Sequence, residues 1–363
     1  MRLAWRKTLR YAQGDVRENA ALMHVSRYHG KDMKMRQEVT RWGILGTGNI
    51  ATKFATGLAY APDAELVAVG SRAKETAEAF GETFKVPRRH ASYEALAADP
   101  EVDAIYASTL NPCHKPNTIL CLEAGKAVLC EKPFAINAAE AAEMIAVARR
   151  EKRFLMEAMW TRFIPATVRV REWMAEGAIG APRMFHGSFG FAADKQRLWD
   201  PEMGGGALLD VGIYPLSYAS MIFGRQPVDV AALAEIGKTG VDEQGAVVLR
   251  YDDGELATLT FAFRTETFHE ARIMGTKGRI DVAPPFWKAT EATLYEGEGL
   301  NPRATRIALP CDGNGYEFEA AEVGRCLREG KLESDVMPLD ETLAIMKTMD
   351  RIREQWGMKY PME

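Results

Sequence analysis

The stretch Thr40-Arg-Trp-Gly-Ile-Leu45 is largely apolar, and it runs directly into Gly46-Thr-Gly48-Asn-Ile-Ala51, which has the spacing G-x-G-x-x-A. The residues after it repeat apolar side chains at helical intervals, so the glycines lie between a predicted strand and a predicted helix. In such a turn the first glycine permits a tight bend, the second lets the backbone approach a pyrophosphate, and the helix amino terminus binds the anion. We therefore predict a dinucleotide-binding site that includes Gly46, Gly48, Asn49 and Ile50.

The composition sets the broad class of the protein. With 363 residues the chain exceeds what one hydrophobic core usually supports, so two domains are expected. A hydrophobic content of 47% and a charged content of 26% are ordinary for a soluble globular protein. The net charge of −4 gives no general attraction to nucleic acid or to an anionic membrane, and we expect neither as a partner.

Cysteine and histidine usage argues against disulfide and metal sites. The five cysteines contain no C-x-x-C pair, and the six histidines contain no H-x-x-x-H pair. This pattern is typical of small core residues in a reducing compartment. We expect a cytoplasmic protein without a metal site.

Residues 1–38 differ in composition from the rest of the chain. They are rich in Arg and Lys, show no sustained apolar period and lack the apolar core of a secretory signal. We expect a basic, disordered N-terminal extension here. The dinucleotide-binding domain is then placed at 39–160, and a substrate-binding and oligomerisation domain at 161–363.

The end of the second predicted strand, Ala64–Gly70, indicates which cofactor binds. An NAD site places an acidic residue there for the ribose 2′-hydroxyl, but Glu65 lies at the beginning of the strand. The strand ends in Gly-Ser71-Arg72 instead, and a hydroxyl plus a guanidinium suits a 2′-phosphate. We therefore predict NADP rather than NAD, while Arg72 on a solvated helix face remains the alternative.

Further apolar runs alternate with helical segments, as in a parallel sheet wound on both faces. The run Val102–Ala107 leads into the polar loop Ser108–His114. The carboxyl ends of parallel strands share one edge, where ligands bind in open α/β sheets. We expect Thr109, Asn111 and His114 beside the cofactor, although His114 is equally compatible with a core or surface histidine.

The run Ala127-Val-Leu-Cys-Glu-Lys-Pro133 begins like a buried parallel strand and ends in an acid, a base and a proline. Proline cannot donate to a sheet ladder, so the strand should stop there and leave Glu131 and Lys132 at the same carboxyl edge. Taken alone, the two residues indicate only a solvated charge pair before a turn. With the dinucleotide turn upstream, Lys132 becomes a candidate catalytic and cofactor-binding residue, and Glu131 a candidate cofactor contact.

The second half of the chain has the patterns of an α+β domain. Apolar residues alternate along Arg183–Phe191, Val228–Ala234, Ala246–Tyr251, Leu256–Phe263 and His269–Met274. Helical patterns at Leu209–Ile222 and Tyr316–Glu329 are interspersed with them. We predict a largely antiparallel sheet with associated helices.

The chain contains five motifs in a fixed order: Gly46–Ala51, Leu122–Pro133, Met156–Phe163, Gly204–Tyr214 and Gly275–Gly278. Together they resemble the Gfo/Idh/MocA oxidoreductase family, in particular its branch of dimeric dihydrodiol dehydrogenases and NADP-dependent D-xylose dehydrogenases. The resemblance implies an α/β protein with an N-terminal Rossmann domain and a C-terminal α+β domain whose large, mostly antiparallel open-faced sheet pairs with another subunit in a dimer or tetramer. It also implies a cis peptide before Pro133.

The stretch Gly204–Tyr214 completes the predicted site. Its three glycines let backbone lie close to a ligand, and the helix that follows carries Asp210 and Tyr214 four residues apart on one face. Each residue alone also fits ordinary packing at a helix start. Together with Lys132, we interpret Tyr214 as the acid–base, Lys132 as the cation that lowers its pKa, and Asp210 as the group that orients the lysine or the substrate hydroxyls.

The family resemblance implies that Trp160, Arg162 and Phe163 wall a substrate pocket. We expect reversible, NADP-dependent oxidation of a hydroxyl on a cyclic sugar, such as xylose or glucose, or on a cyclic diol. Two alternatives stay open: a dinucleotide-binding regulator without turnover, and an enzyme that retains its cofactor and acts as a glycosidase or sugar oxidoreductase. The presence of both Lys132 and Tyr214 favours turnover, because a regulator needs neither.

Overall fold

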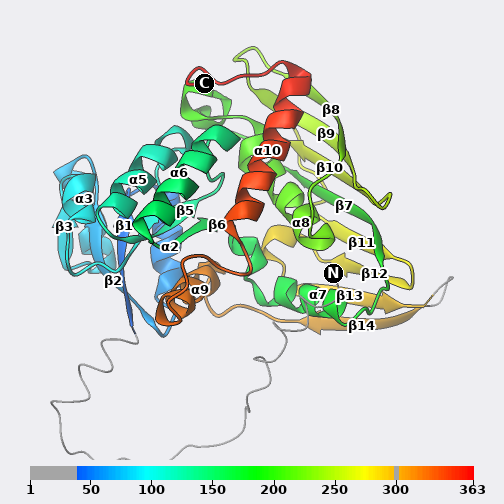
Figure 1. Cartoon of the computed structure of the whole chain (residues 1–363), viewed down its shortest axis with the longest axis horizontal. Coiled ribbons are helices and arrows are strands. Elements are labelled where there is room, and N and C mark those ends of the chain that lie inside the picture. Colours follow the sequence, from blue (N-terminus) through cyan, green and yellow to red (C-terminus); the bar gives the residue numbers. More distant parts are fainter. Residues whose placement is uncertain (1–38, 298–301) are drawn as a thin grey trace, which may run out of the picture. The chain divides into compact units, whose positions relative to one another are not determined.

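A computed structural model of the chain describes residues 39–297 and 302–363. Residues 39–363 belong to one compact unit, organised around two sheets (Figure 1). The extension predicted for residues 1–38 lies outside the described residues.

The first sheet has six parallel strands in the spatial order β3-β2-β1-β4-β5-β6. The chain order reverses between the neighbours β1 and β4, so the connections after these strands diverge and open a crevice at the carboxyl edge. The predicted parallel sheet is therefore confirmed. Its strands are β1 Thr40–Leu45, β2 Ala64–Gly70, β3 Arg88–His90, β4 Ala104–Ala107, β5 Ala127–Glu131 and β6 Leu155–Ala158.

Helices connect these strands, and local signals set where several of them begin and end. The side chain of Asn137 accepts a hydrogen bond of 2.9 Å from the Glu140 amide and so caps the start of α6. Helix α3 ends at Lys85, which has the left-handed backbone conformation common after a last helical turn. The helices are α2 Asn49–Leu58, α3 Lys74–Phe84, α4 Tyr93–Ala97, α5 His114–Glu123 and α6 Ala138–Glu151.

The second sheet has eight strands in the order β14-β13-β12-β11-β7-β10-β9-β8. Neighbouring strands are antiparallel, except that β7 and β10 are parallel. The predicted mostly antiparallel sheet is confirmed, although the sequence patterns did not single out β12 to β14. The strands are β7 Pro182–Gly190, β8 Asp229–Ile236, β9 Asp242–Arg250, β10 Leu256–Ala262, β11 Ala271–Gly275, β12 Gly278–Val282, β13 Glu291–Glu296 and β14 Arg303–Ala308.

Four helices of the second half pack against the two sheets or against the helices of the first half. Helices α7, α8 and α10 pack on the second sheet, and α10 also lies along α6 of the first half (Figure 1). Helix α9 packs on α2, where Gly57 permits a close approach: a Cβ there would lie 2.9 Å from the Tyr316 Cβ. These helices are α7 Pro165–Ala175, α8 Ile213–Phe223, α9 Tyr316–Arg328 and α10 Leu339–Trp356.

One segment of the second half has the length and hydropathy of a membrane span. It covers Pro201–Phe223 and includes α8, but 83% of its most apolar window is buried inside the protein. Helix α8 packs against β7, β10 and α10. The apolar character of this segment is therefore explained by its place in the core.

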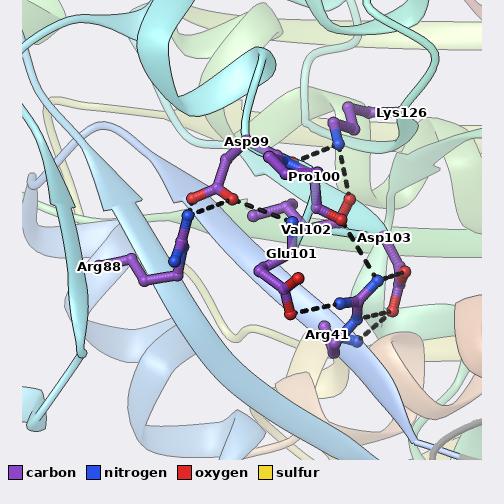
Figure 2. Close-up of polar contacts among 8 residues, drawn as sticks. All are labelled: Arg41, Arg88, Asp99, Pro100, Glu101, Val102, Asp103 and Lys126. Atoms are coloured by element: carbon purple, nitrogen blue, oxygen red, sulfur yellow. Dashed lines mark hydrogen bonds and ion pairs between the residues drawn. The ribbon is translucent and has the colours of Figure 1, made fainter.

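A polar network ties together the amino ends of the parallel strands (Figure 2). Lys126, directly before β5, donates from Nζ to the carbonyls of Asp99 and Val102, the latter at 2.8 Å. Arg41 on β1 donates to the two carboxylate oxygens of Asp103, at 2.9 and 2.7 Å. The network fixes the sheet edge opposite the crevice.

Asp99 is the buried carboxylate of this network. Its side chain is fully buried and accepts hydrogen bonds of 2.5 and 2.8 Å from the Arg88 guanidinium. Burial alone would raise the pKa of Asp99, but the hydrogen bonds from Arg88, from the Glu101 amide and from His90 outweigh it and lower the pKa to about 2. The folded state therefore favours the ionised form.

We expect Asp99→Asn to lower the free energy of unfolding by about 2 kcal/mol at pH 7. A lowered carboxyl pKa stabilises the folded state at pH values above the unfolded-state pKa of about 4. This contribution is lost as the pH falls toward 2. The difference in the free energy of unfolding between wild type and Asp99→Asn should therefore shrink to roughly half at pH 3. Urea unfolding at both pH values measures it. The control is Glu101→Gln, whose exposed carboxylate should contribute less than about 0.5 kcal/mol; a pH-independent effect of Asp99→Asn would contradict this account.

Candidate functional site

A cavity of about 1170 Å³ lies at the carboxyl edge of the parallel sheet and extends to the second sheet. This exceeds the usual volume of a pocket for one small ligand, about 300–1,000 Å³. Every residue predicted to contact the cofactor lines it. They are Gly46, Gly48, Asn49, Ile50, Ser71, Arg72, Thr109, Asn111, His114, Glu131 and Lys132.

The turn after β1 has the features of a pyrophosphate cradle. Gly46 has a φ of +104°, which favours glycine, and its amide donates to the Gly70 carbonyl at 2.9 Å. A Cβ added to Gly48 would meet no protein atom within 4 Å, so the space beside it is open to a ligand. No side chain caps the start of α2, which leaves its first amide groups free to bind an anion. The residues present therefore fit a dinucleotide.

The end of β2 brings a hydroxyl and a guanidinium to the cavity. The Ser71 hydroxyl lies 2.6 Å from the Thr76 hydroxyl, which also lines the cavity, and Arg72 is exposed beside them. Arg72 also faces Tyr93: burial raises the pKa of the Tyr93 phenol, and the nearby guanidinium opposes that rise. Glu65, at the other end of the strand, is not among the lining residues.

Lys132 is the centre of the site. Its Nζ donates to the Asp210 carbonyl at 2.7 Å, lies 3.6 Å from the Asp210 carboxylate, and sits 4.8 Å from the centre of the Tyr214 ring. Burial would lower the pKa of the ammonium, but Tyr214, Asp210 and Glu131 outweigh burial and raise it. Lys132 is therefore charged at neutral pH. The peptide bond that follows it, before Pro133, is cis, as the resemblance implied.

Tyr214 lies inside the cavity and is only 7% exposed. The indole N–H of Trp160 donates to its hydroxyl at 3.0 Å. Burial raises the pKa of Tyr214, and the Lys132 charge and the Trp160 hydrogen bond offset this only in part. The expectation that Lys132 lowers this pKa below its usual value is thus corrected: desolvation outweighs the lysine charge, and the phenol keeps its proton at neutral pH.

Glu131 is buried directly behind Lys132. One of its carboxylate oxygens accepts from the Tyr106 hydroxyl, and the other accepts from the Lys132 amide at 3.1 Å. Burial raises the pKa of Glu131 to about 7, against the hydrogen bonds and the lysine charge. The cavity therefore contains a carboxyl group whose pKa is about 7.

Asp210 and Tyr214 reach the cavity through a local change of helix type. Leu208–Gly212 form a π-helical turn, and Ile213–Phe223 continue as the α-helix α8. The sequence predicted one regular helix across both residues. The wider turn, a feature common at functional sites, directs the Asp210 carbonyl and carboxylate toward Lys132.

The structure does not place Arg162 and Phe163 in the cavity wall, which corrects that part of the prediction. Trp160–Arg162 form a single 3-10 turn, so neighbouring side chains point in different directions. Arg162 turns into the interior, where it donates to the Ser217 carbonyl at 2.8 Å and to Glu341 of α10 at 2.7 Å. Trp160 does line the cavity, as predicted.

An aromatic wall lines the cavity on the side of the second sheet. Phe189 and Trp287 stack with ring centres 3.4 Å apart, and Tyr316 stacks on Trp160 at 4.9 Å. Lys195 and Arg197 also line the cavity, and an Arg197 nitrogen lies 4.0 Å from the Asp210 carboxylate. The alternation along β7 identified Phe189 as one face of a sheet; that this face meets a cavity required the tertiary structure.

Two predicted residues of the loop after β4 also hold the protein together. The Asn111 amide donates to the Gly204 carbonyl at 2.9 Å. The His114 ring nitrogens lie 2.8 Å from the Pro133 carbonyl and 3.0 Å from the Thr109 carbonyl. Burial lowers the pKa of His114. Both residues therefore fix the loops around Lys132 as well as lining the cavity.

Comparison with family models shows matches over most of the chain. Residues 40–159 match the model described as an oxidoreductase family with an NAD-binding Rossmann fold. Residues 167–281 match the GFO/IDH/MocA C-terminal domain.

Similar proteins include curated enzymes and solved structures. Trans-1,2-dihydrobenzene-1,2-diol dehydrogenases are 40% identical in Mus musculus and 38% identical in Homo sapiens, each over 89% of this chain and 98% of the relative. The aldose-aldose oxidoreductase of Caulobacter crescentus, complexed with glycerol, matches with a TM-score of 0.80 and 26% identity over 88% of this chain and 98% of that one. A 3-ketoreductase of Actinomadura kijaniata, with NADP and TDP-benzene, matches with a TM-score of 0.76 and 26% identity over 87% and 97%.

Proposed function

Because this chain belongs to the Gfo/Idh/MocA oxidoreductase family, we propose that it is an NADP-dependent dehydrogenase that oxidises a hydroxyl of a cyclic diol or sugar. Its activity as a dehydrogenase with a nicotinamide cofactor follows from the family and from relatives up to 40% identical. The choice of NADP, the substrate and the residue roles are our proposals.

One observation carries the proposal: Lys132, Asp210 and Tyr214 converge in the same cavity as the dinucleotide turn. They come from two segments that are 78 residues apart in sequence. A module that only binds a dinucleotide has no need for a buried ammonium beside a buried phenol, because desolvating both groups is costly. The convergence therefore supports turnover.

A nicotinamide cofactor held at the Gly46–Ile50 turn would supply the hydride acceptor for the alcohol carbon. The hydroxyl proton of that alcohol passes to the Tyr214 oxygen, and it returns to the substrate oxygen in the reverse direction. The Lys132 charge and the Trp160 N–H stabilise the phenolate that must form for oxidation. Because burial raises the pKa of Tyr214, the phenol is suited to donate its proton to a carbonyl in the reductive direction.

The lining of the cavity supports a cyclic substrate with hydroxyl groups. Phe189, Trp287 and Trp160 offer flat apolar faces, on which a ring packs. The Asp210 carboxylate offers an acceptor for a second hydroxyl beside the reacting one. The names of the diol dehydrogenase relatives and of the aldose oxidoreductase agree with both substrate classes.

We expect Tyr214→Phe and Lys132→Met each to lower kcat by about 10²- to 10⁴-fold, because each removes a group that handles the proton or its charge. Turnover is measured from the absorbance of reduced cofactor with a panel of cyclic diols and aldoses. Tyr60→Phe and Lys347→Met, at exposed positions, are the matched controls. If both site variants fold and keep full turnover, the catalytic assignment is wrong. Wild-type turnover without added cofactor would instead favour an enzyme that retains it.

We expect Arg72→Ala to raise the KM for NADP by about 10- to 100-fold and to leave the KM for NAD unchanged, because only NADP carries a 2′-phosphate for the guanidinium. Steady-state kinetics with both cofactors measure this. Lys74→Ala, at an exposed position two residues away, is the control. Equal losses with NAD and NADP would contradict the proposed role.

The second sheet supports the homo-oligomer that we also propose. Val248, Met184 and Leu233 are 41%, 43% and 80% exposed, and the strand registers place them on the face opposite the buried Phe185. Large apolar side chains exposed on a sheet face are typical of a surface that another chain covers. We expect light scattering to give the mass of a dimer or tetramer, and Val248→Glu to shift it toward the monomer. Leu332→Glu, an exposed position on no strand, should leave it unchanged; a monomeric wild type would contradict the proposal.

A further inference from the structure

We propose that the segment Met358–Glu363, together with Asp242, acts as a latch that positions the catalytic turn Gly204–Gly212 against Lys132. The inference rests on the proposed function for the role of Lys132, Asp210 and Tyr214. The residues of the latch do not line the cavity, so they are positioning residues and not catalytic ones.

The first contact of the latch is made by Tyr360. It is 2% exposed, and its hydroxyl donates to the Gly205 carbonyl at 2.6 Å. Gly205 itself has no room for a side chain, because a Cβ there would lie 2.6 Å from the Leu198 carbonyl oxygen. Tyr360 therefore binds the backbone of the glycine run Gly204–Gly206 but does not line the cavity.

The second contact is made by Asp242, the first residue of β9. It is fully buried, and one carboxylate oxygen accepts from the Leu208 amide at 2.6 Å, at the start of the π-helical turn. Its other oxygen lies against Gly206, where a Cβ would lie 2.4 Å from it. A buried carboxylate thus fixes the backbone two residues before Asp210.

The third contact joins this segment to the loop between Lys132 and α6. Arg353, at the end of α10, lies 5.0 Å from the Tyr360 ring and pairs with Glu363 at 2.6 and 2.9 Å. Its guanidinium also donates to the Ile136 carbonyl at 3.4 Å, and Asn137 donates to Glu363 at 2.9 Å. Ile136 and Asn137 lie a few residues after Lys132, where α6 begins.

The latch therefore positions both partners of the hydrogen bond between Lys132 and Asp210, and its residues do so without lining the cavity. Tyr360 and Asp242 fix the turn that supplies the Asp210 carbonyl, while Arg353 and Glu363 fix the loop after Lys132. The contact between them consists of the 2.7 Å hydrogen bond from the Lys132 Nζ to the Asp210 carbonyl and the Asp210 carboxylate 3.6 Å away. Because a shift of about 1 Å at reacting groups lowers rates by up to about 10²-fold, small movements of either segment matter.

The test is Tyr360→Phe, which removes only the hydroxyl and keeps the ring against Arg353. We expect kcat to fall about five- to tenfold, as for the loss of one hydrogen bond, with an unchanged KM for the cofactor. Amide hydrogen exchange of the peptide covering Gly204–Gly212 should speed up, while that of the Gly46–Ala51 peptide stays at the wild-type rate. The exchange measurement does not depend on turnover, so failure of the latch and failure of the proposed function are separable.

Asp242 supplies a rescue series. Asp242→Ala removes the acceptor of the Leu208 amide and should reproduce the faster exchange and lower kcat; Asp242→Asn keeps a carbonyl oxygen there and should restore exchange to within about twofold of wild type. Lys359→Gln, an exposed position in the same segment, is the control. Unchanged exchange at Gly204–Gly212 in Tyr360→Phe, or equal acceleration in the Gly46–Ala51 peptide, would overturn the proposal.

Discussion

A single buried ammonium holds the two halves of the site together. The Nζ of Lys132, at the end of a parallel strand, reaches the Asp210 carbonyl on a π-helical turn of the second half. A desolvated charge is stable only with such partners, so the position of each half depends on the other.

Burial also decides which groups carry charge in the cavity. It raises the pKa values of Tyr214 and Glu131, and it would discharge Lys132 as well if Asp210, Tyr214 and Glu131 did not oppose it. The outcome is a buried, charged Lys132 beside a protonated phenol, with a carboxyl group whose pKa is about 7 behind them. This arrangement suits a site that exchanges a proton with its substrate while a hydride moves.

Residues close together in the sequence show which features of the site local sequence patterns can predict and which they cannot. Trp160 and Arg162 belong to one motif, and both were expected in the pocket wall, yet only Trp160 lines the cavity. Arg162 instead pairs with Glu341 on α10, a helix that the sequence patterns did not single out. Phe189 was identified as part of a sheet face, but its stacking partner Trp287 lies almost a hundred residues further along the chain. Such pairings depend on strand order, which local patterns do not contain.

The sequence by itself determined the dinucleotide turn, the parallel sheet and the placement of Lys132 at a strand end. These features depend on near neighbours: glycine permits the bend after β1, proline ends β5, and apolar spacing specifies helix or strand. Only the tertiary structure decided the pKa of Tyr214, the π-helical turn beneath Asp210 and the burial of Arg162. These properties depend on how completely distant segments exclude water and on which partners they bring within hydrogen-bonding distance.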